Sequence, residues 1–528
     1  MGGNITGIDF KSAGSISLLD ARIKGILNWQ HGTEICYKEG VAFQADRIRS
    51  RGIYLRNGFK TDGEISILGA IIDGSLICTG GKFFDISAQN ISVNGDVLLD
   101  AQSSNPDNYF QSVGKVVLSS SKINGSLKCS GGEFVDIDAE NISVEGDIEL
   151  NRVQKRNFQS TGKILLSNAN VNGTLLCIRG IFYNPDDFAI EAEHLIVKNI
   201  YLVGSGVAGH INFYGSKTGG TFRISDMIWR DSSRLSLDQV STKTLLEKMN
   251  GWPQKNNLSL LGFTYEFIDS RSEQETSILN VKNALHWIGL VENFHPQPYE
   301  QLASVFIKSG LEKEAHEIQI AKNKLLDGKE KRKLVKMLEL EDEYDACEFS
   351  SEIIHTKPQI FKSHTELWDC IFYLFKRFFF GAIIGYGYRV KRLLPIFLYL
   401  FLSSSCFFYW AGSESHNIMT SSQKTLRSSE DVYSSDLPGT PEWTGKHTEG
   451  DDLTLAQIIS DNYPHFRPCV YSLDIIIPLV DLGQEEYWMP NHNNDWGKWV
   501  YFFVVFLKLS GWGISTLLVY AVTGLIRR

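Results

Sequence analysis

The sequence predicts a mainly β N-terminal solenoid, similar to a right-handed β-helix, then an α-helical neck and a C-terminal α-helical region with two membrane spans. Three observations lead to this prediction. The first half of the chain repeats at spacings of 51 and then 48 residues, helical periodicity begins near residue 276, and two long apolar stretches lie near the C-terminus. At 528 residues the chain has room for roughly two to four domains.

Glycine-led blocks define the repeat. Similar blocks begin at Gly63, Gly114 and Gly162, and each divides into shorter units of about 21 residues in which apolar and polar side chains alternate. Alternation with a period of two, inside repeats of about 20 to 25 residues, is typical of short strands that stack coil on coil. We therefore predict a β-solenoid over residues 1–272, with SSNPDNYF (103–110) looping out.

Three cysteines occupy the same position in the repeat: Cys78 in GSLIC, Cys129 in GSLKC and Cys177 in GTLLC. Alternation places each on the side of the leucine two residues before it, so we expect an interior ladder of small apolar side chains. The eight cysteines of the chain show no CxxC and no metal spacing, which indicates reduced thiols. We predict no catalytic, cofactor or metal site.

GSGVAG (204–209) matches the glycine fingerprint of a dinucleotide site. Such a site needs a helix after the glycines, because the helix N-terminus holds the pyrophosphate. The segment that follows, HINFYGSKTGGTFRI, alternates and has no helical period. It aligns instead with NGSLKCSG (124–131), so we interpret Gly209 as a coil glycine equivalent to Gly125.

Helical patterns replace the repeat after residue 276. We predict a helical neck over residues 273–362, in which SILNVKNALHWIGLVENF has helical spacing and Pro296 and Pro298 break the chain. Two further helices meet at Gly310, a glycine expected to end the first of them, as in a tetratricopeptide-like hairpin. The charged run DGKEKRKLVKMLELEDEYD is expected to be a solvated helix.

Two apolar stretches are long enough to cross about 30 Å of hydrocarbon. They are residues 393–412 and residues 499–526, and Lys508 in the second is expected either to snorkel to the interface or to pair inside a bundle. Basic residues flank both spans on one side, which predicts that these flanks lie in the cytoplasm. The loop 413–498, with fourteen acidic and five basic residues, is then extracytoplasmic, and the solenoid and C-terminus are cytosolic at a bacterial inner membrane.

Gly385-Tyr386-Gly387 spells part of a potassium-channel selectivity filter, but it precedes the first span on the basic side. A filter lies between two spans, after a pore helix. We interpret residues 363–392 as an interfacial amphipathic helix followed by a glycine-permitted bend.

A short apolar segment, residues 469–482, lies between the two spans and is too short to cross. A span, a half-length segment, a turn at Gly483 and a second span follow each other in the order of a two-span pore module. Asp474 and Asp481 are seven residues apart, which predicts one helical face and, in an oligomer, an acidic ring around a cation path. The alternative is a helix lying on the bilayer surface with both carboxylates in water.

Four segments resemble a family of bacterial membrane proteins that carry repeat-rich β-solenoid N-terminal regions and are often labelled membrane-associated oxidoreductases. They are QPYEQLASVFIKSGLEKEA, IGYGYRVKRLLP, VYSLDIIIPLVDLGQEEYW and GWGISTLLVYAVTGLIRR. The resemblance covers roughly residues 255–528, whereas the solenoid is similar in style more than in sequence. The resemblance implies a bacterial membrane protein and supplies no established catalytic residues.

Three functions follow from these observations. The first is a non-enzymatic scaffold or sensor whose solenoid binds a protein partner or drives homo-oligomerisation, tethered to the lipid bilayer. The second is a pore-like effector gated from the solenoid, with Asp474, Asp481 and Lys508 as its pore or coupling residues; a membrane-acting defence effector would suit this layout. The third is the redox enzyme that the family label suggests. No basic field indicates nucleic-acid binding.

Overall fold

The computed structural model describes residues 3–269, 277–337, 393–413, 418–421, 464–478, 480–491 and 495–523. The predicted interfacial helix and the Gly-Tyr-Gly bend (363–392), together with most of the predicted acidic loop, lie outside these residues. The chain forms two compact units, residues 1–325 and 326–528. Each unit is described by itself.

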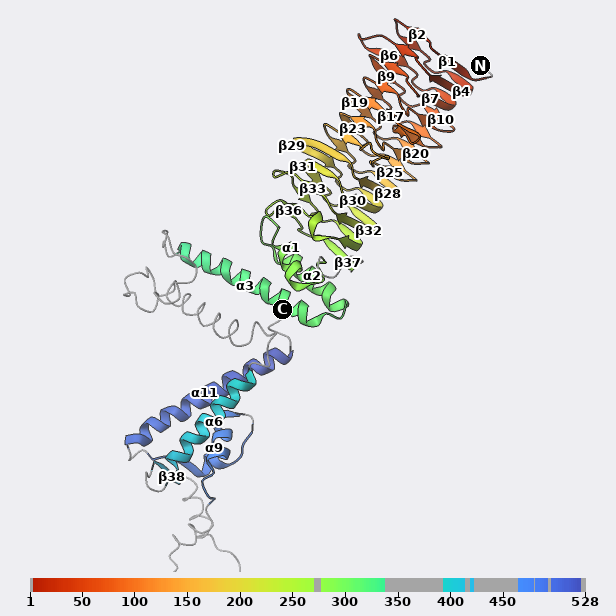
Figure 1. The fold of residues 1–528 in the computed structure, drawn as a ribbon. Coiled ribbons are helices and arrows are strands. Elements are labelled where there is room, and N and C mark those ends of the chain that lie inside the picture. The colour runs from red at the N-terminus through yellow and green to blue at the C-terminus, as the bar shows by residue number, and fades with distance from the viewer. Residues whose placement is uncertain are drawn as a thin grey trace, which may run out of the picture. The chain divides into compact units, whose positions relative to one another are not determined.

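The first unit is a β-solenoid, as predicted, built from two long sheets in which every neighbouring pair of strands is parallel (Figure 1). The first sheet contains β1 (Ile5–Ile8), β4 (Arg22–Gln30), β7 (Arg49–Leu55), β10 (Ile71–Ile72), β11 (Leu76–Ile77), β14 (Ser92–Val93), β15 (Val97–Leu98), β20 (Lys122–Ile123), β21 (Leu127–Lys128), β24 (Ser143–Val144), β25 (Ile148–Glu149), β28 (Asn170–Ile178), β30 (Ile196–Val203), β32 (Lys217–Ser225), β35 (Ser241–Glu247) and β37 (Thr264–Asp269). The second contains β2 (Lys11–Ser12), β3 (Ile16–Ser17), β5 (Glu34–Ile35), β6 (Val41–Gln44), β8 (Lys60–Thr61), β9 (Glu64–Ser66), β12 (Lys82–Phe83), β13 (Ile86–Ser87), β18 (Gln111–Ser112), β19 (Lys115–Val117), β22 (Glu133–Phe134), β23 (Asp136–Asp138), β26 (Gln159–Ser160), β27 (Ile164–Leu165), β29 (Ile181–Glu191), β31 (Gly206–Asn212), β33 (Ile228–Trp229), β34 (Leu235–Ser236) and β36 (Leu258–Ser259).

An aromatic ladder runs through the interior of the solenoid. Successive coils contribute one buried phenylalanine each, with ring centroids 4.9 to 5.5 Å apart: Phe59, Phe83, Phe110, Phe134, Phe158 and Phe182. A glycine lies two residues before several of these rings, where any larger residue would collide with the ring. A Cβ on Gly132, for example, would lie 2.7 Å from the ring of Phe134. The stack therefore has one continuous core shared between coils.

A stack of glycines forms one corner of the first sheet: Gly74, Gly95, Gly125, Gly146 and Gly173. From Gly95 onward, each donates its N–H to the carbonyl of the glycine in the preceding coil, at 2.8 to 3.1 Å. The next residue in each coil accepts a backbone N–H from the coil that follows. Thus Ser75 Oγ accepts from Asp96 N at 3.1 Å and Asp96 Oδ1 accepts from Ser126 N at 2.8 Å. These bonds satisfy buried backbone groups at the corner.

The predicted cysteine ladder is confirmed. Cys78, Cys129 and Cys177 are at most 2% exposed, and burial raises the pKa of each thiol. The strand register alternates them with leucines from the intervening coils, as Cys177 stands opposite Leu202. These thiols are therefore core side chains and not exposed nucleophiles.

The predicted excursion at 103–110 is confirmed as an antiparallel hairpin of β16 (Ala101–Gln102) and β17 (Asn105–Tyr109). The first two residues of GSGVAG, Gly204 and Ser205, form the turn between β30 and β31, with Gly204 at a φ of +61°, and the other four residues begin β31. The proposed equivalence of Gly209 with Gly125 is wrong, because Gly209 lies in the second sheet and Gly125 in the glycine corner of the first. The alignment failed because both sheets use glycine at close approaches between coils.

Helices α1 (Val281–Ile288), α2 (Pro296–Lys308) and α3 (Glu312–Met337) follow the last coil, which includes a short 3-10 turn, η1 (Met249–Gly251). Pro296 and Pro298 do not break the chain; they form the first turn of α2, where a missing N–H costs nothing. Gly310 ends this helix with a φ of +78°, as predicted. Trp287 of α1 packs on Trp252 at 5.1 Å, so the helices cover the end of the solenoid core.

A buried carboxylate fixes this helical cover. Glu247 is 1% exposed, and its Oε1 accepts the N–H of Ile278 at 2.9 Å, just before α1. Burial raises the pKa of Glu247. On α2, Gln301 Nε2 donates to the carbonyl of Tyr265 at 2.6 Å. The cover is thus attached to the last coil by polar contacts as well as by the tryptophans. Whether it also acts as a neck to the membrane region stays a prediction.

The second unit contains α6 (Leu393–Ala411), α9 (Pro468–Ile476), α10 (Gln484–Tyr487) and α11 (Asp495–Thr523), and a short antiparallel pair, β38 (Met419–Ser421) and β39 (Trp488–Pro490). Helices α6 and α11 are long and apolar enough to cross a membrane. Only 22% of the most apolar stretch of α6 and 17% of that of α11 are buried. Figure 1 shows α6, α9 and α11 side by side.

Candidate functional site: an acidic hollow beside α11

Helix α9 packs against both α6 and α11, and it ends beside the middle of α11. Its Tyr471 packs edge-on against Phe408 of α6 at 4.8 Å. At the far end of α9, the carbonyl oxygen of Ile476 lies so close to Gly511 of α11 that a Cβ there would be 2.0 Å away. The end of α9 can approach α11 this closely only because residue 511 is a glycine and has no side chain. From Trp496 to Gly511, α11 rises about 22 Å.

The chain then turns back toward the start of α9. Gln484 Oε1 accepts the N–H of Arg467 at 3.0 Å, and Trp488 Nε1 donates to the carbonyl of Pro464 at 2.9 Å. The backbone N–H of Asn491 donates to the carbonyl of Ile418 at 2.8 Å. Residues 464–478 and 480–491 therefore fold back on themselves beside α11, and we call them the re-entrant segment: α9 leads to a tip at residues 477–478 and 480–483, and a returning arm follows.

Asp474 holds the two arms of this segment together. Its carboxylate accepts the backbone N–H of Leu482 at 2.7 Å and that of Glu485 at 2.9 Å. The residue is 7% exposed, so the prediction that Asp474 faces water from a surface helix is wrong. Hydrogen bonds from backbone N–H groups satisfy a buried carboxylate, and removing it would leave both donors without their acceptor.

Asp481 is exposed and lies in the tip. Its Oδ1 accepts the N–H of Gly483 at 2.8 Å, and Gly483 has a φ of +75°, which places the predicted turn where the sequence suggested. Asp474 and Asp481 do not share a helical face, because α9 ends at Ile476 before Pro478. They come together through the turn instead.

One hollow of about 450 Å³ brings the three predicted residues together. Asp474, Asp481 and Lys508 all line it, and Lys508 Nζ forms an ion pair with Glu485. Whether Lys508 also snorkels to a membrane interface stays a prediction. Glu486 and Trp512 complete its polar and apolar rims. Four carboxylates face one lysine, so the hollow has an excess of negative charge and favours cations.

Glu485, Glu486 and Trp512 were missed as site residues by the sequence analysis. Gly483 could have indicated the two glutamates, because a tight turn at this glycine folds the residues after it, QEEYW, back alongside α9. Trp512 had a weaker signal, its spacing of four residues from Lys508, which places both on one face of α11.

Within the part of the chain that the structure describes, no group of three or more His, Cys, Asp and Glu side chains is arranged to hold a metal ion. Comparison of the chain with protein-family models, curated proteins and solved structures gave no match.

Proposed function

We propose that this protein is a non-enzymatic, membrane-tethered scaffold or sensor of the bacterial inner membrane. In this proposal α6 and α11 anchor the chain in the bilayer, and the solenoid, facing the cytosol, binds a protein partner or a second copy of the chain. The redox activity of the resembled family stays an alternative, which a bound chromophore in the purified protein would support.

The exposed surface of α6 and α11 is the observation that supports the tether. Large apolar side chains line the outside of both helices: Leu394, Leu398, Tyr399, Leu402, Trp499, Phe502, Phe506, Leu509 and Trp512. An apolar surface of this extent on a soluble protein would drive aggregation, whereas lipid covers it at no cost. Trp410 and Trp496 meet at 6.0 Å at one end of the pair, as expected for side chains at a membrane interface.

Cysteine labelling in spheroplasts tests the tether and its orientation. The two sites are the native, exposed Cys36 of the solenoid and a cysteine introduced as Thr420→Cys in β38, each in a chain whose other accessible cysteines are serine. A membrane-impermeant maleimide is expected to label Thr420→Cys in intact spheroplasts and Cys36 only after permeabilisation. The chain is expected to stay in the membrane fraction after alkaline carbonate washing. Release by the wash, or labelling of Cys36 in intact cells, would contradict the proposal.

The re-entrant segment favours a second candidate, a cation path. If Trp410 and Trp496 mark the membrane interface, a segment that follows α11 for about 22 Å reaches past the middle of a hydrocarbon layer of about 30 Å. The carboxylates of its tip would then lie inside the membrane. In a ring of copies around an axis, Asp481 would supply the acidic lining that cation channels use.

Potassium flux through liposomes containing the full chain tests this path. Asp481→Asn is the informative variant, because Asp481 is exposed, whereas Asp474→Asn would also disturb the fold of the tip. A pore predicts flux in the parent protein and a loss of at least about fivefold in Asp481→Asn. Glu312→Gln, at the exposed start of α3, is the matched control and should conduct as the parent does. Equal flux from the parent and Asp481→Asn, or no flux from verified insertions, would rule this candidate out.

A further inference from the structure

A shallow trough crosses the last coils of the solenoid on the outer face of its second sheet. Its floor consists of side chains from three successive coils, among them His210, Arg234 and Asn257, and it encloses about 350 Å³. Phe188 bounds it at one end and Glu292 at the other. Beside Glu292, Val291 forms a parallel β-bridge with Leu258, so this segment continues the stack as one more coil would. Four coil steps of about 4.8 Å make it about 19 Å long.

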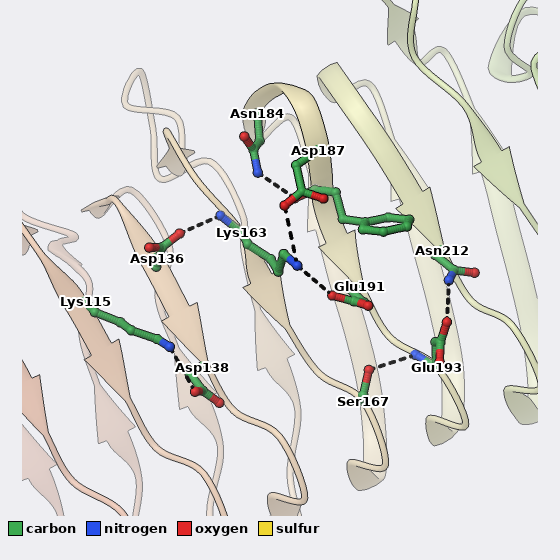
Figure 2. Close-up of polar contacts among 11 residues, drawn as sticks. Lys115, Asp136, Asp138, Lys163, Ser167, Asn184, Asp187, Glu191, Glu193 and Asn212 are labelled. Carbon is green, nitrogen blue, oxygen red and sulfur yellow. Dashed lines mark hydrogen bonds and ion pairs between the residues drawn. The ribbon is translucent and has the colours of Figure 1, made fainter.

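An insertion in β29 builds the aromatic end of the trough. The register with β31 shifts on both sides of Phe188, because residues 184–187 leave the regular coil. Asn184 Nδ2 donates to the carbonyl of Phe188 at 2.8 Å, which closes the insertion. Lys163 holds it from the preceding coil: its Nζ lies 3.5 Å from Asp187 (Figure 2) and 5.5 Å from the centre of the Phe188 ring. A half-buried phenylalanine is thus held on an outer surface by specific polar contacts.

The polar side chains of the trough are oriented by their neighbours. Asn212 Nδ2 donates to Glu193 at 2.8 Å, and Asn212 Oδ1 accepts the N–H of Tyr214 at 3.0 Å (Figure 2 shows the first contact). Asn257 donates to the carbonyl of Asp231 at 2.8 Å. Side chains fixed in this way offer their remaining donors and acceptors to a ligand with little further loss of conformational freedom.

His210 carries an unused hydrogen-bonding atom. Its Nδ1 is buried and has no hydrogen-bond partner among the residues that the structure describes, although its ring packs edge-on against Phe188 at 5.9 Å. Burial and then the positive charge of Arg234 lower the pKa of His210, so the imidazole is neutral near pH 7. A buried polar atom without a partner is uncommon in folded proteins and points to a missing contact.

The charges at the trough exclude strongly charged ligands. Glu193 and Glu292 oppose an anion, and Arg234, whose ion pair with Glu292 is 3.8 Å long, opposes a cation. An elongated, neutral, polyhydroxylated molecule matches an aromatic wall, amide and hydroxyl groups on the floor and carboxylates at the rim.

We propose that this trough binds a short neutral oligosaccharide along the solenoid axis, with Phe188 against the apolar face of a sugar ring and His210, Asn212 and Arg234 bonded to its hydroxyls. The trough belongs to the first unit alone, so its ligand does not depend on how α6, α9 and α11 act.

Calorimetric titration of the full chain in nanodiscs tests the proposal, because detergents with sugar headgroups would compete. The probes are maltotriose, cellotriose and tri-N-acetylchitotriose, with pyrophosphate as an anionic probe. At least one trisaccharide is expected to bind with a Kd of about 0.01–1 mM, and Phe188→Ala and Arg234→Ala are each expected to weaken it at least about tenfold.

Tyr183→Ala is the matched control, since Tyr183 is another exposed aromatic residue of β29 and lies outside the trough. It should bind as the parent does. Three results would overturn the proposal: no trisaccharide binding at about 10 mM, binding that Phe188→Ala leaves unchanged, or binding of pyrophosphate alone that Arg234→Ala abolishes. The last result would assign the trough to an anion.

Discussion

Replacing Phe134 by alanine is expected to lower the free energy of unfolding of the solenoid by about 3–5 kcal/mol. The ring is 2% exposed and lies between Phe110 at 4.9 Å and Phe158 at 5.4 Å. Its removal leaves a cavity in the middle of the ladder, and the close coil spacing set by backbone bonds prevents the neighbours from filling it. Urea unfolding of the full chain in nanodiscs, followed by the β-sheet circular dichroism signal, measures the loss.

Phe84→Ala provides the control for this prediction. Phe84 is 45% exposed and follows the buried Phe83 of the same ladder, so the change removes the same side chain from the surface. We expect it to alter the free energy of unfolding by no more than about 0.5 kcal/mol. Equal effects of the two substitutions would show that the ladder does not carry the stability assigned to it.

Gly511→Ala is expected to displace α9 and to destabilise the second unit by about 1–3 kcal/mol. The new Cβ would lie 2.0 Å from the carbonyl oxygen of Ile476 and 2.8 Å from its carbon, and backbone atoms cannot move aside as a side chain can. Hydrogen exchange at the amides of Leu482 and Glu485 is the measurement, because both donate to Asp474. These amides should exchange faster when α9 shifts.

Gly513→Ala, two residues further along α11, is the matched control. A Cβ at Gly513 meets nothing within 4 Å. Alanine favours a helix more than glycine does, by about 1 kcal/mol, so exchange at Leu482 and Glu485 should stay unchanged. Faster exchange in Gly513→Ala as well would mean that α11 itself, and not the contact with Ile476, responds to the change.

The solenoid could be predicted from sequence because its glycines and alternating strands recur. The aromatic ladder was missed, although its phenylalanines recur 24 residues apart at most steps. The glycine spacing varies between 21 and 30 residues, because insertions lie between the corners of different coils, and this variation obscured the second period. A repeat is therefore easier to detect through the side chains that touch in the core than through its turns.

The candidate site was predicted by residue and not by geometry. Asp474, Asp481 and Lys508 do meet in one hollow, but a helical face was the wrong reason. Helix α9 ends before Pro478, and the tip is shaped by hydrogen bonds between residues eight and eleven positions apart. Such contacts depend on where the chain turns back, which no periodic pattern encodes. Pro296 and Pro298 were misjudged for a similar reason. A proline breaks a helix in its interior but fits its first turn, and the sequence pattern did not locate where α2 begins.

The side chains at the glycine corner alternate from coil to coil: Ser75, Asp96, Ser126 and Asp147, each bonded to the backbone of the next. Loss of a single coil would bring Asp96 beside Asp147, at the strand spacing of about 4.8 Å, and place two carboxylates side by side. Loss or gain of two coils would restore the alternation. The unit by which such a chain can lengthen or shorten without pairing carboxylates is therefore a pair of coils, and the repeat spacings of 51 and 48 residues are each the length of one such pair.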